Sequence, residues 1–201
     1  MTELTVQTPN ESVCHVFTID GYRVPVRVGG RENGRYVVMF EDNRHDDGAY
    51  DEVRERLHRL HIALICTVVV GADPRLTTKS VVRILDRLGV TGAVLVGDGL
   101  CAELSWKLAA HHPERFRGLV VVDAGHPRVP DTTGVVRDAD CPHVDVDTTV
   151  LVSTPVARSV AQASRRYVHG DFRLTEMAGW RGSKHFAAQL ATEVVLRSYS
   201  W

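Results

Sequence analysis

The sequence has few lysines, no large charge imbalance and no long apolar run. Its formal net charge is −1 at pH 7, and its only lysines are Lys79, Lys107 and Lys184. Because a near-neutral chain has little electrostatic attraction for nucleic acid or an anionic membrane surface, we expect neither as a partner. No apolar run reaches membrane-spanning length, and the first residues show no basic stretch followed by an apolar one. We therefore expect a cytoplasmic protein without a secretory signal.

Paired cysteines are also missing. The four cysteines lie far apart, and no C-x-x-C spacing is present among Cys14, Cys66, Cys101 and Cys141. Cysteine metal sites usually use such pairs, so we expect neither a metal nor a cofactor. Buried, reduced thiols are the simplest interpretation for a cytoplasmic protein.

Short apolar runs and segments of helical periodicity alternate along most of the chain. Residues 15–19 and 22–28 alternate in polarity around an Asp-Gly turn, which predicts a hairpin. Further strands are expected at 35–40, 61–70, from 93 into the turn at 97–101, and at 119–124, 148–153 and 172–177. Helices are expected at 50–60, 77–88, from that turn to 111, at 160–167, and in a terminal segment with the apolar stripe Phe186, Leu190, Val194 and Val195. This order predicts a single α/β domain over residues 1–201, with residues 1–12 as a loose end. Its mostly parallel sheet should have about seven or eight strands and helices on both faces.

Residues 93–124 carry the clearest motif. A strand leads into Gly97-Asp98-Gly99-Leu100-Cys101, a helix follows, and His112-Pro113-Glu114-Arg115 precedes a second apolar run. This stretch resembles the α/β-hydrolase superfamily, in which a strand enters the nucleophile elbow G-x-S-x-G and a helix leaves it. The resemblance implies an α/β-hydrolase-like domain. In this alignment the nucleophile's position is occupied by Gly99, which has no side chain to attack a substrate.

A register shifted by two residues would make Cys101 the nucleophile. Glu103 would then stand where the family has its closing glycine, at a point where the helix and strand backbones approach closely. A large charged residue does not suit that place, so the register with Gly99 at the elbow is favoured.

The other catalytic positions implied by the resemblance also differ. Trp180 stands where the family has its histidine base, and the segment after residue 153 offers no carboxylate for the acid. Residues 125–147 are too short and too weakly periodic for the helical cap that usually covers the site. Hydrolysis on this fold needs a nucleophile, a base, an acid and oxyanion donors. The chain is therefore predicted to be a non-catalytic homologue that acts as a binding or scaffold protein.

One alternative keeps enzymatic activity. A weak or divergent ester or thioester hydrolase would use Cys101 as nucleophile, His185 as base and Asp123 as acid. We expect Cys101 to point into helix–strand packing, where a buried thiol is inert.

The carboxyl ends of parallel strands form a crevice in folds of this class. The resemblance places the remnant elbow and pocket there, made of Gly97, Asp98, Gly99, Leu100 and Trp180. The expected rim consists of Glu41, Asp42, Asp73, Asp123, His126 and Ser153. Such a rim would suit an amine or another cationic small molecule, or its carboxylates are simply solvated above a filled pocket. Trp180 is expected near Gly99, with its indole either filling the site or turned outward. Self-association into a homo-oligomer is a third role that the sequence leaves open.

Overall fold

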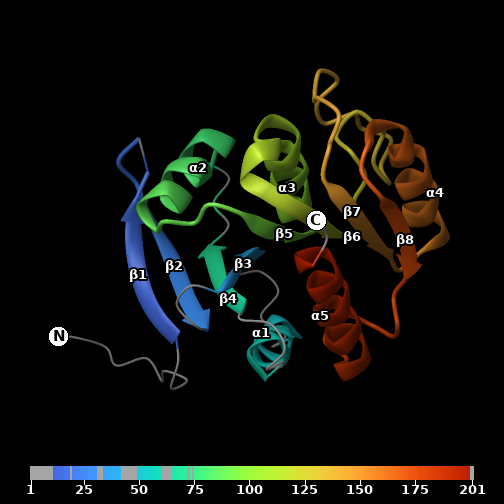
Figure 1. The fold of residues 1–201 in the computed structure, drawn as a ribbon. Coiled ribbons are helices and arrows are strands. Elements are labelled where there is room, and N and C mark those ends of the chain that lie inside the picture. Colours follow the sequence, from blue (N-terminus) through green and yellow to red (C-terminus); the bar gives the residue numbers. More distant parts are fainter. Residues whose placement is uncertain are drawn as a thin grey trace.

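The computed structural model describes residues 11–18, 20–30, 34–41, 49–59, 65–71, 73 and 75–199. Within these ranges the chain forms eight strands, five α-helices and two short 3-10 helices (Figure 1). The strands are β1 Glu11–Phe17, β2 Arg23–Gly30, β3 Arg35–Glu41, β4 Ile65–Gly71, β5 Ala93–Asp98, β6 Phe116–Val122, β7 Asp147–Val152 and β8 Phe172–Glu176. The α-helices are α1 Ala49–Arg59, α2 Thr78–Arg87, α3 Leu100–His111, α4 Pro155–Ser164 and α5 Lys184–Ser198, and the 3-10 helices are η1 Pro113–Arg115 and η2 Arg165–Tyr167.

All eight described strands belong to one sheet with the order β1-β2-β4-β3-β5-β6-β7-β8. The hairpin strand β2 pairs antiparallel with β1 and with β4, and every other pair in the sheet is parallel. Parallel neighbours require a crossover connection, and helices supply most of these crossovers here. The predicted fold class, a mostly parallel sheet with helices, is confirmed.

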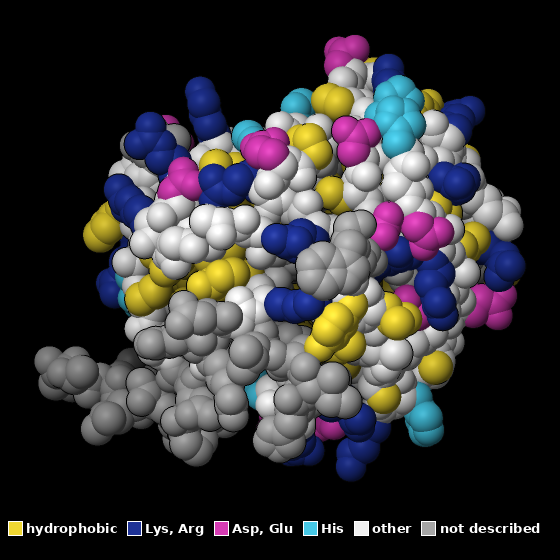
Figure 2. Space-filling model, viewed as in Figure 1, with side chains coloured by type: hydrophobic (Ala, Val, Ile, Leu, Met, Phe, Trp, Pro, Cys, Tyr) yellow, Lys and Arg dark blue, Asp and Glu magenta, His cyan; other side chains and the backbone are white. Residues whose placement is uncertain are grey.

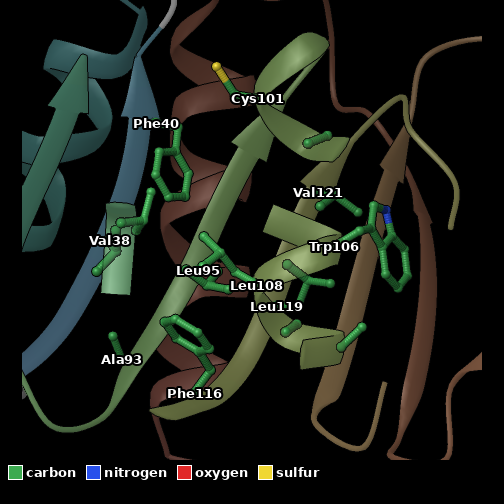
Figure 3. Packing of buried hydrophobic residues seen from close by; sticks show 14 of the residues in the cluster. Val38, Phe40, Ala93, Leu95, Cys101, Trp106, Leu108, Phe116, Leu119 and Val121 are labelled. Atoms are coloured by element: carbon green, nitrogen blue, oxygen red, sulfur yellow. The ribbon is translucent and has the colours of Figure 1, made fainter. Parts of the chain in front are cut away.

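Helices cover both faces of the sheet. In Figure 1, α2, α3 and α4 lie on one side and α1 and α5 on the other. Side chains of a strand alternate between the two faces. In β5, Ala93 and Leu95 accordingly join the core under α2, α3 and α4, while Val94 and Val96 join the core under α1 and α5. Figure 3 shows Leu108 and Trp106 of α3 beside apolar side chains of β5 and β6. This packing fixes α3 and the end of β5 relative to each other.

Among the predicted boundaries that were wrong, the starts of two elements differ most. Strand β1 begins at Glu11, inside the segment expected to be a loose end, and residues 1–10 lie outside the described residues. Helix α4 begins at Pro155, five residues before the predicted start. Thr154 caps it, because its hydroxyl accepts a hydrogen bond of 3.1 Å from the Ala157 amide, and proline suits the first helical position. The fourth strand was predicted over residues 61–70, and the part of it before Ile65 lies outside the described residues.

The connection between β6 and β7 contains no helix. All of residues 123–146 are described, and they form turns and a single bridge between Val144 and Val168. The predicted absence of a helical cap therefore agrees with this part of the structure.

Basic and acidic side chains are interspersed on the face drawn in Figure 2. Among the described helices, none is long and apolar enough to cross a membrane.

Candidate functional site

A tight turn joins β5 to α3 at the carboxyl edge of the sheet. Gly99 forms it with φ of 55° and ψ of −120°, a conformation that glycine adopts far more easily than other residues. A Cβ atom added at Gly99 would meet no atom of the described side chains and backbone within 4 Å, so among these residues the turn points into open space. A Cβ atom at Gly97 would instead overlap Ser105 Oγ and lie 2.8 Å from Ala102 Cα. The close approach of helix and strand thus occurs at Gly97, and the exposed apex of the turn is Gly99.

A single guanidinium joins the ends of two adjacent strands. Arg181 Nη2 donates hydrogen bonds of 2.8 Å to Asp98 Oδ1, at the end of β5, and to Asp123 Oδ2, just after β6. The two aspartate side chains are 17% and 15% exposed, and the Arg181 side chain is 38% exposed. Arg181 reaches this position from the loop between β8 and α5. The guanidinium therefore bridges two largely buried carboxylates beside the Gly99 turn and offsets part of their negative charge.

Asp123 is held from a second side by Ser153, which follows β7. The Ser153 amide donates to Asp123 Oδ1 and the Ser153 hydroxyl donates to Asp123 Oδ2, both at 2.6 Å. Asp123 has a φ of 51°, and it is the one described residue other than glycine with a positive φ. Such a conformation costs about 1–3 kcal/mol and persists where surrounding contacts determine it. The contacts from Ser153 and Arg181 fix the Asp123 carboxylate in place.

Tyr50, near the start of α1, completes the cluster. Its hydroxyl donates a hydrogen bond of 2.9 Å to Asp98 Oδ2. Burial raises the pKa of Asp98, and Arg181 and the Tyr50 hydrogen bond act in the opposite direction. Burial, followed by the charge of Asp98, raises the pKa of Tyr50 well above its usual value. Tyr50 is thus a protonated donor at neutral pH and cannot serve as a base. We call Tyr50, Asp98, Asp123, Ser153 and Arg181 the elbow cluster.

Trp180 does not fill the elbow. Its side chain is 71% exposed, and the neighbouring residue Arg181 reaches the elbow cluster from the same loop. The hypothesis that the indole occupies the substrate's place was therefore wrong, and the outward orientation is the one found. The predicted proximity of Gly99 and Trp180 stays a prediction.

The alternative catalytic residues lie in three different environments. Cys101 is 4% exposed and belongs to the core under α3, as Figure 3 also illustrates. His185 is exposed on the first turn of α5. The Asp123 carboxylate accepts hydrogen bonds from Ser153 and Arg181. A buried thiol and an exposed imidazole do not form the hydrogen-bonded pair that an activated nucleophile needs.

His126 was expected on the rim of the crevice, and this was wrong. Its side chain is fully buried, stacks on Tyr167 and shares a hydrogen bond of 2.9 Å between Nε2 and the Pro142 carbonyl. The Arg128 amide donates to Nδ1, so the ring is a neutral donor at Nε2. Burial lowers the pKa of His126 to about 4. His126 holds the β6–β7 connection together and does not face the elbow cluster.

The remaining residues that were predicted to line the rim lie in different places in the structure. Asp73 binds its own loop, because its Oδ1 accepts from the Arg75 amide at 2.8 Å and its Oδ2 accepts from Arg75 Nη2 at 2.6 Å. These hydrogen bonds lower the pKa of Asp73 to about 2. Ser153 and Asp123 do belong to the elbow cluster. The side chains of Glu41 and Leu100 and all of Asp42 lie outside the described residues. Within the described ranges, no three His, Cys, Asp or Glu residues are arranged to hold a metal ion.

Sequence reasoning missed Tyr50 and Arg181. One signal was available for Arg181. Asp98 and Asp123 end neighbouring parallel strands, so their carboxylates had to lie close together and needed a cation nearby. No comparable signal identified Tyr50, because the sequence pattern around it indicates only the start of a helix.

No protein-family model matches the sequence, and a comparison with curated proteins finds no match either. Solved structures do match over nearly the whole chain. An epoxide hydrolase from Vigna radiata has a TM-score of 0.70 at 12% identity, covering 95% of this chain and 98% of that one. A hydrolase from Pseudomonas aeruginosa has a TM-score of 0.69 at 15% identity, covering 94% and 98%. An esterase from Exiguobacterium antarcticum has a TM-score of 0.68 at 12% identity, covering 90% and 98%.

Proposed function

Because this chain has the α/β-hydrolase fold, with Gly99 at the apex of the elbow, we propose that it is a non-catalytic homologue that acts by binding or as a scaffold. The observation that carries the proposal is the position of Arg181, whose guanidinium joins Asp98 and Asp123 beside the glycine turn. A guanidinium cannot accept a proton at neutral pH, so it cannot act as the base that activates a nucleophile or water. Gly99 itself has no group to attack a substrate.

The elbow cluster also argues against an amine-binding crevice. An amine or other cation would have to compete with Arg181, whose guanidinium already bridges the carboxylates of Asp98 and Asp123 and offsets part of their charge. With two further hydrogen bonds from Ser153 and one from Tyr50, each of the four carboxylate oxygens already accepts from a donor of this chain. We infer that the protein's own side chains occupy the carboxylates at the elbow and that this protein recognises its partner at another surface. The cytoplasmic location, the absence of nucleic-acid and membrane partners and the capacity to form homo-oligomers stay predictions.

Hydrolysis of short-chain nitrophenyl esters tests the proposal. The purified protein should release nitrophenol at the rate of buffer alone, and Cys101→Ala and His185→Ala should give the same result. Turnover well above buffer that disappears in either variant would support the thiol-dependent hydrolase instead. Any such turnover should be measured beside protein treated with a cysteine-blocking reagent, which separates thiol-dependent release of nitrophenol from release at other groups.

A further inference from the structure

A cavity opens at the amino-terminal ends of the parallel strands, opposite their carboxyl ends, where the elbow cluster lies. Its volume is about 270 Å³, and it lies where the central strands β3 and β5 begin. Its lining consists of Gly34, Arg35, Tyr36, Thr91, Gly92, Ala93, Val94, Arg117 and Ser198. Strand β5 runs from Ala93 at this cavity to Asp98 at the elbow. At about 3.3 Å per residue the two sites are about 16 Å apart, so they are independent.

Arg117 reaches the cavity from an irregularity in β6. Ala93 pairs with Phe116 and Val94 pairs with Gly118, so Arg117 is an extra residue opposite the start of β5. A bulge of this kind redirects a side chain, and Arg117 is the one exposed residue of an otherwise buried strand. Gly92 leaves room for it, because a Cβ atom at Gly92 would lie 3.1 Å from Arg117 Nε. The local backbone thus presents a guanidinium at the mouth of the cavity.

The charge of Arg117 is uncompensated within the described part of the chain. No hydrogen bond or ion pair joins Arg117 to another described residue, and none of the described lining residues carries a carboxylate. Arg35 lies on the other side of β5, because β3 and β6 are its two neighbours in the sheet. The Arg35 guanidinium donates to the Ser198 carbonyl and lies 4.0 Å from the centre of the Tyr199 ring. Arg35 therefore offsets the negative carboxyl end of α5, which leaves the charge of Arg117 for a ligand.

We propose that this cavity binds a small anion through Arg117, with Arg35 beside it. The ligand is a small molecule that carries a phosphate or a carboxylate group, since the planar guanidinium fork matches both. This site lies apart from the elbow cluster, and its existence does not depend on whether the elbow is catalytic.

Isothermal titration calorimetry with two probes tests the proposal. Inorganic phosphate and malonate are titrated separately into the full-length protein at constant ionic strength. Saturable binding of one or both probes is expected, and the stronger probe identifies the chemical class of the anion. Arg117→Gln should weaken that binding by about tenfold or more, because a charged hydrogen-bond donor is lost. Arg83→Gln is the matched control, since Arg83 is exposed on α2 and is absent from the cavity lining.

A second variant guards against a folding defect in Arg117→Gln. Gly92→Ala keeps both arginines but places a methyl group against Arg117 Nε, so it should also weaken binding while Arg83→Gln leaves it unchanged. Absence of saturable binding for both probes would overturn the proposal. Equal affinity in the unmodified protein, Arg117→Gln and Gly92→Ala would overturn it too.

Discussion

Replacing Arg181 with glutamine should lower the free energy of unfolding by about 2–3 kcal/mol at pH 8. The reason is that the Asp98 and Asp123 carboxylates, 17% and 15% exposed, lose the cation that both contact at 2.8 Å. Breaking a fully buried ion pair costs about 3–5 kcal/mol. We expect less here because Arg181 is 38% exposed and water partly replaces its charge. Urea unfolding at pH 8 measures the change.

The loss in Arg181→Gln should be smaller at pH 5 than at pH 8. Burial already raises the pKa of Asp98, and Arg181 opposes that rise. Without Arg181 the pKa of Asp98 rises further, so the folded variant binds a proton at a pH where the unfolded chain has released it. A carboxyl group of this kind makes the folded state less stable as the pH rises through its folded-state pKa. Protonation of Asp98 at lower pH therefore relieves part of its repulsion from Asp123.

Arg158→Gln is the control for this experiment. Arg158 and Glu176 form an ion pair whose side chains are 45% and 76% exposed, and its loss should change the free energy of unfolding by less than about 0.5 kcal/mol. If Arg181→Gln were as stable as the unmodified protein at pH 8, Arg181 would not be what holds the two carboxylates together.

Replacing Gly97 with alanine should lower the free energy of unfolding by about 3 kcal/mol. A Cβ atom there would overlap Ser105 Oγ and lie 2.8 Å from both Ala102 Cα and the Cys101 carbonyl oxygen. Two of these three contacts are backbone atoms, so α3 must move away from β5. Overpacking of a close-packed core typically costs about 1–3 kcal/mol. We expect a loss near the top of this range, because a whole helix must move away from a central strand. Thermal and urea unfolding both measure the loss.

Gly99→Ala is the matched variant two residues away. Its Cβ atom would meet no described atom within 4 Å, and only the backbone conformation, with φ of 55° and ψ of −120°, opposes it. That strain costs about 1–3 kcal/mol, and because it comes without the backbone overlap found at Gly97, Gly99→Ala should be milder than Gly97→Ala. The reverse order would mean that the close approach of α3 to β5 lies at Gly99 and that the elbow register is wrong.

The fold could be predicted from local signals in the sequence. Residues 93–124 combine two apolar runs with glycines at a strand-to-helix turn, and such patterns depend on neighbours in the chain. The start of α4 was also signalled, by Thr154 followed by Pro155, but the weak apolar period favoured a later start. Burial on both faces explains why the central strands read as continuous apolar runs.

The elbow cluster could be predicted only in part. Asp98 ends a strand, and Asp123 and Ser153 each directly follow one, and the carboxyl ends of parallel strands meet on one side of the sheet. The contact between Arg181 and Asp98 spans 83 residues, and the contact between Tyr50 and Asp98 spans 48. Contacts of this kind depend on how a loop and a helix pack in three dimensions. The resemblance to the α/β-hydrolase pattern placed Trp180 at the functional position, whereas the conformation of the loop directs the next side chain, Arg181, toward the elbow.

Ester hydrolysis by Gly99→Ser tests most directly whether the elbow has lost both its nucleophile and its base. The new hydroxyl would stand in open space at the apex of the turn, but Arg181 cannot take its proton. We expect Gly99→Ser to hydrolyse nitrophenyl acetate no faster than the unmodified protein and buffer. Turnover in Gly99→Ser that is lost when His185→Ala is added would contradict the loss of the base, because a working base would then reach the elbow.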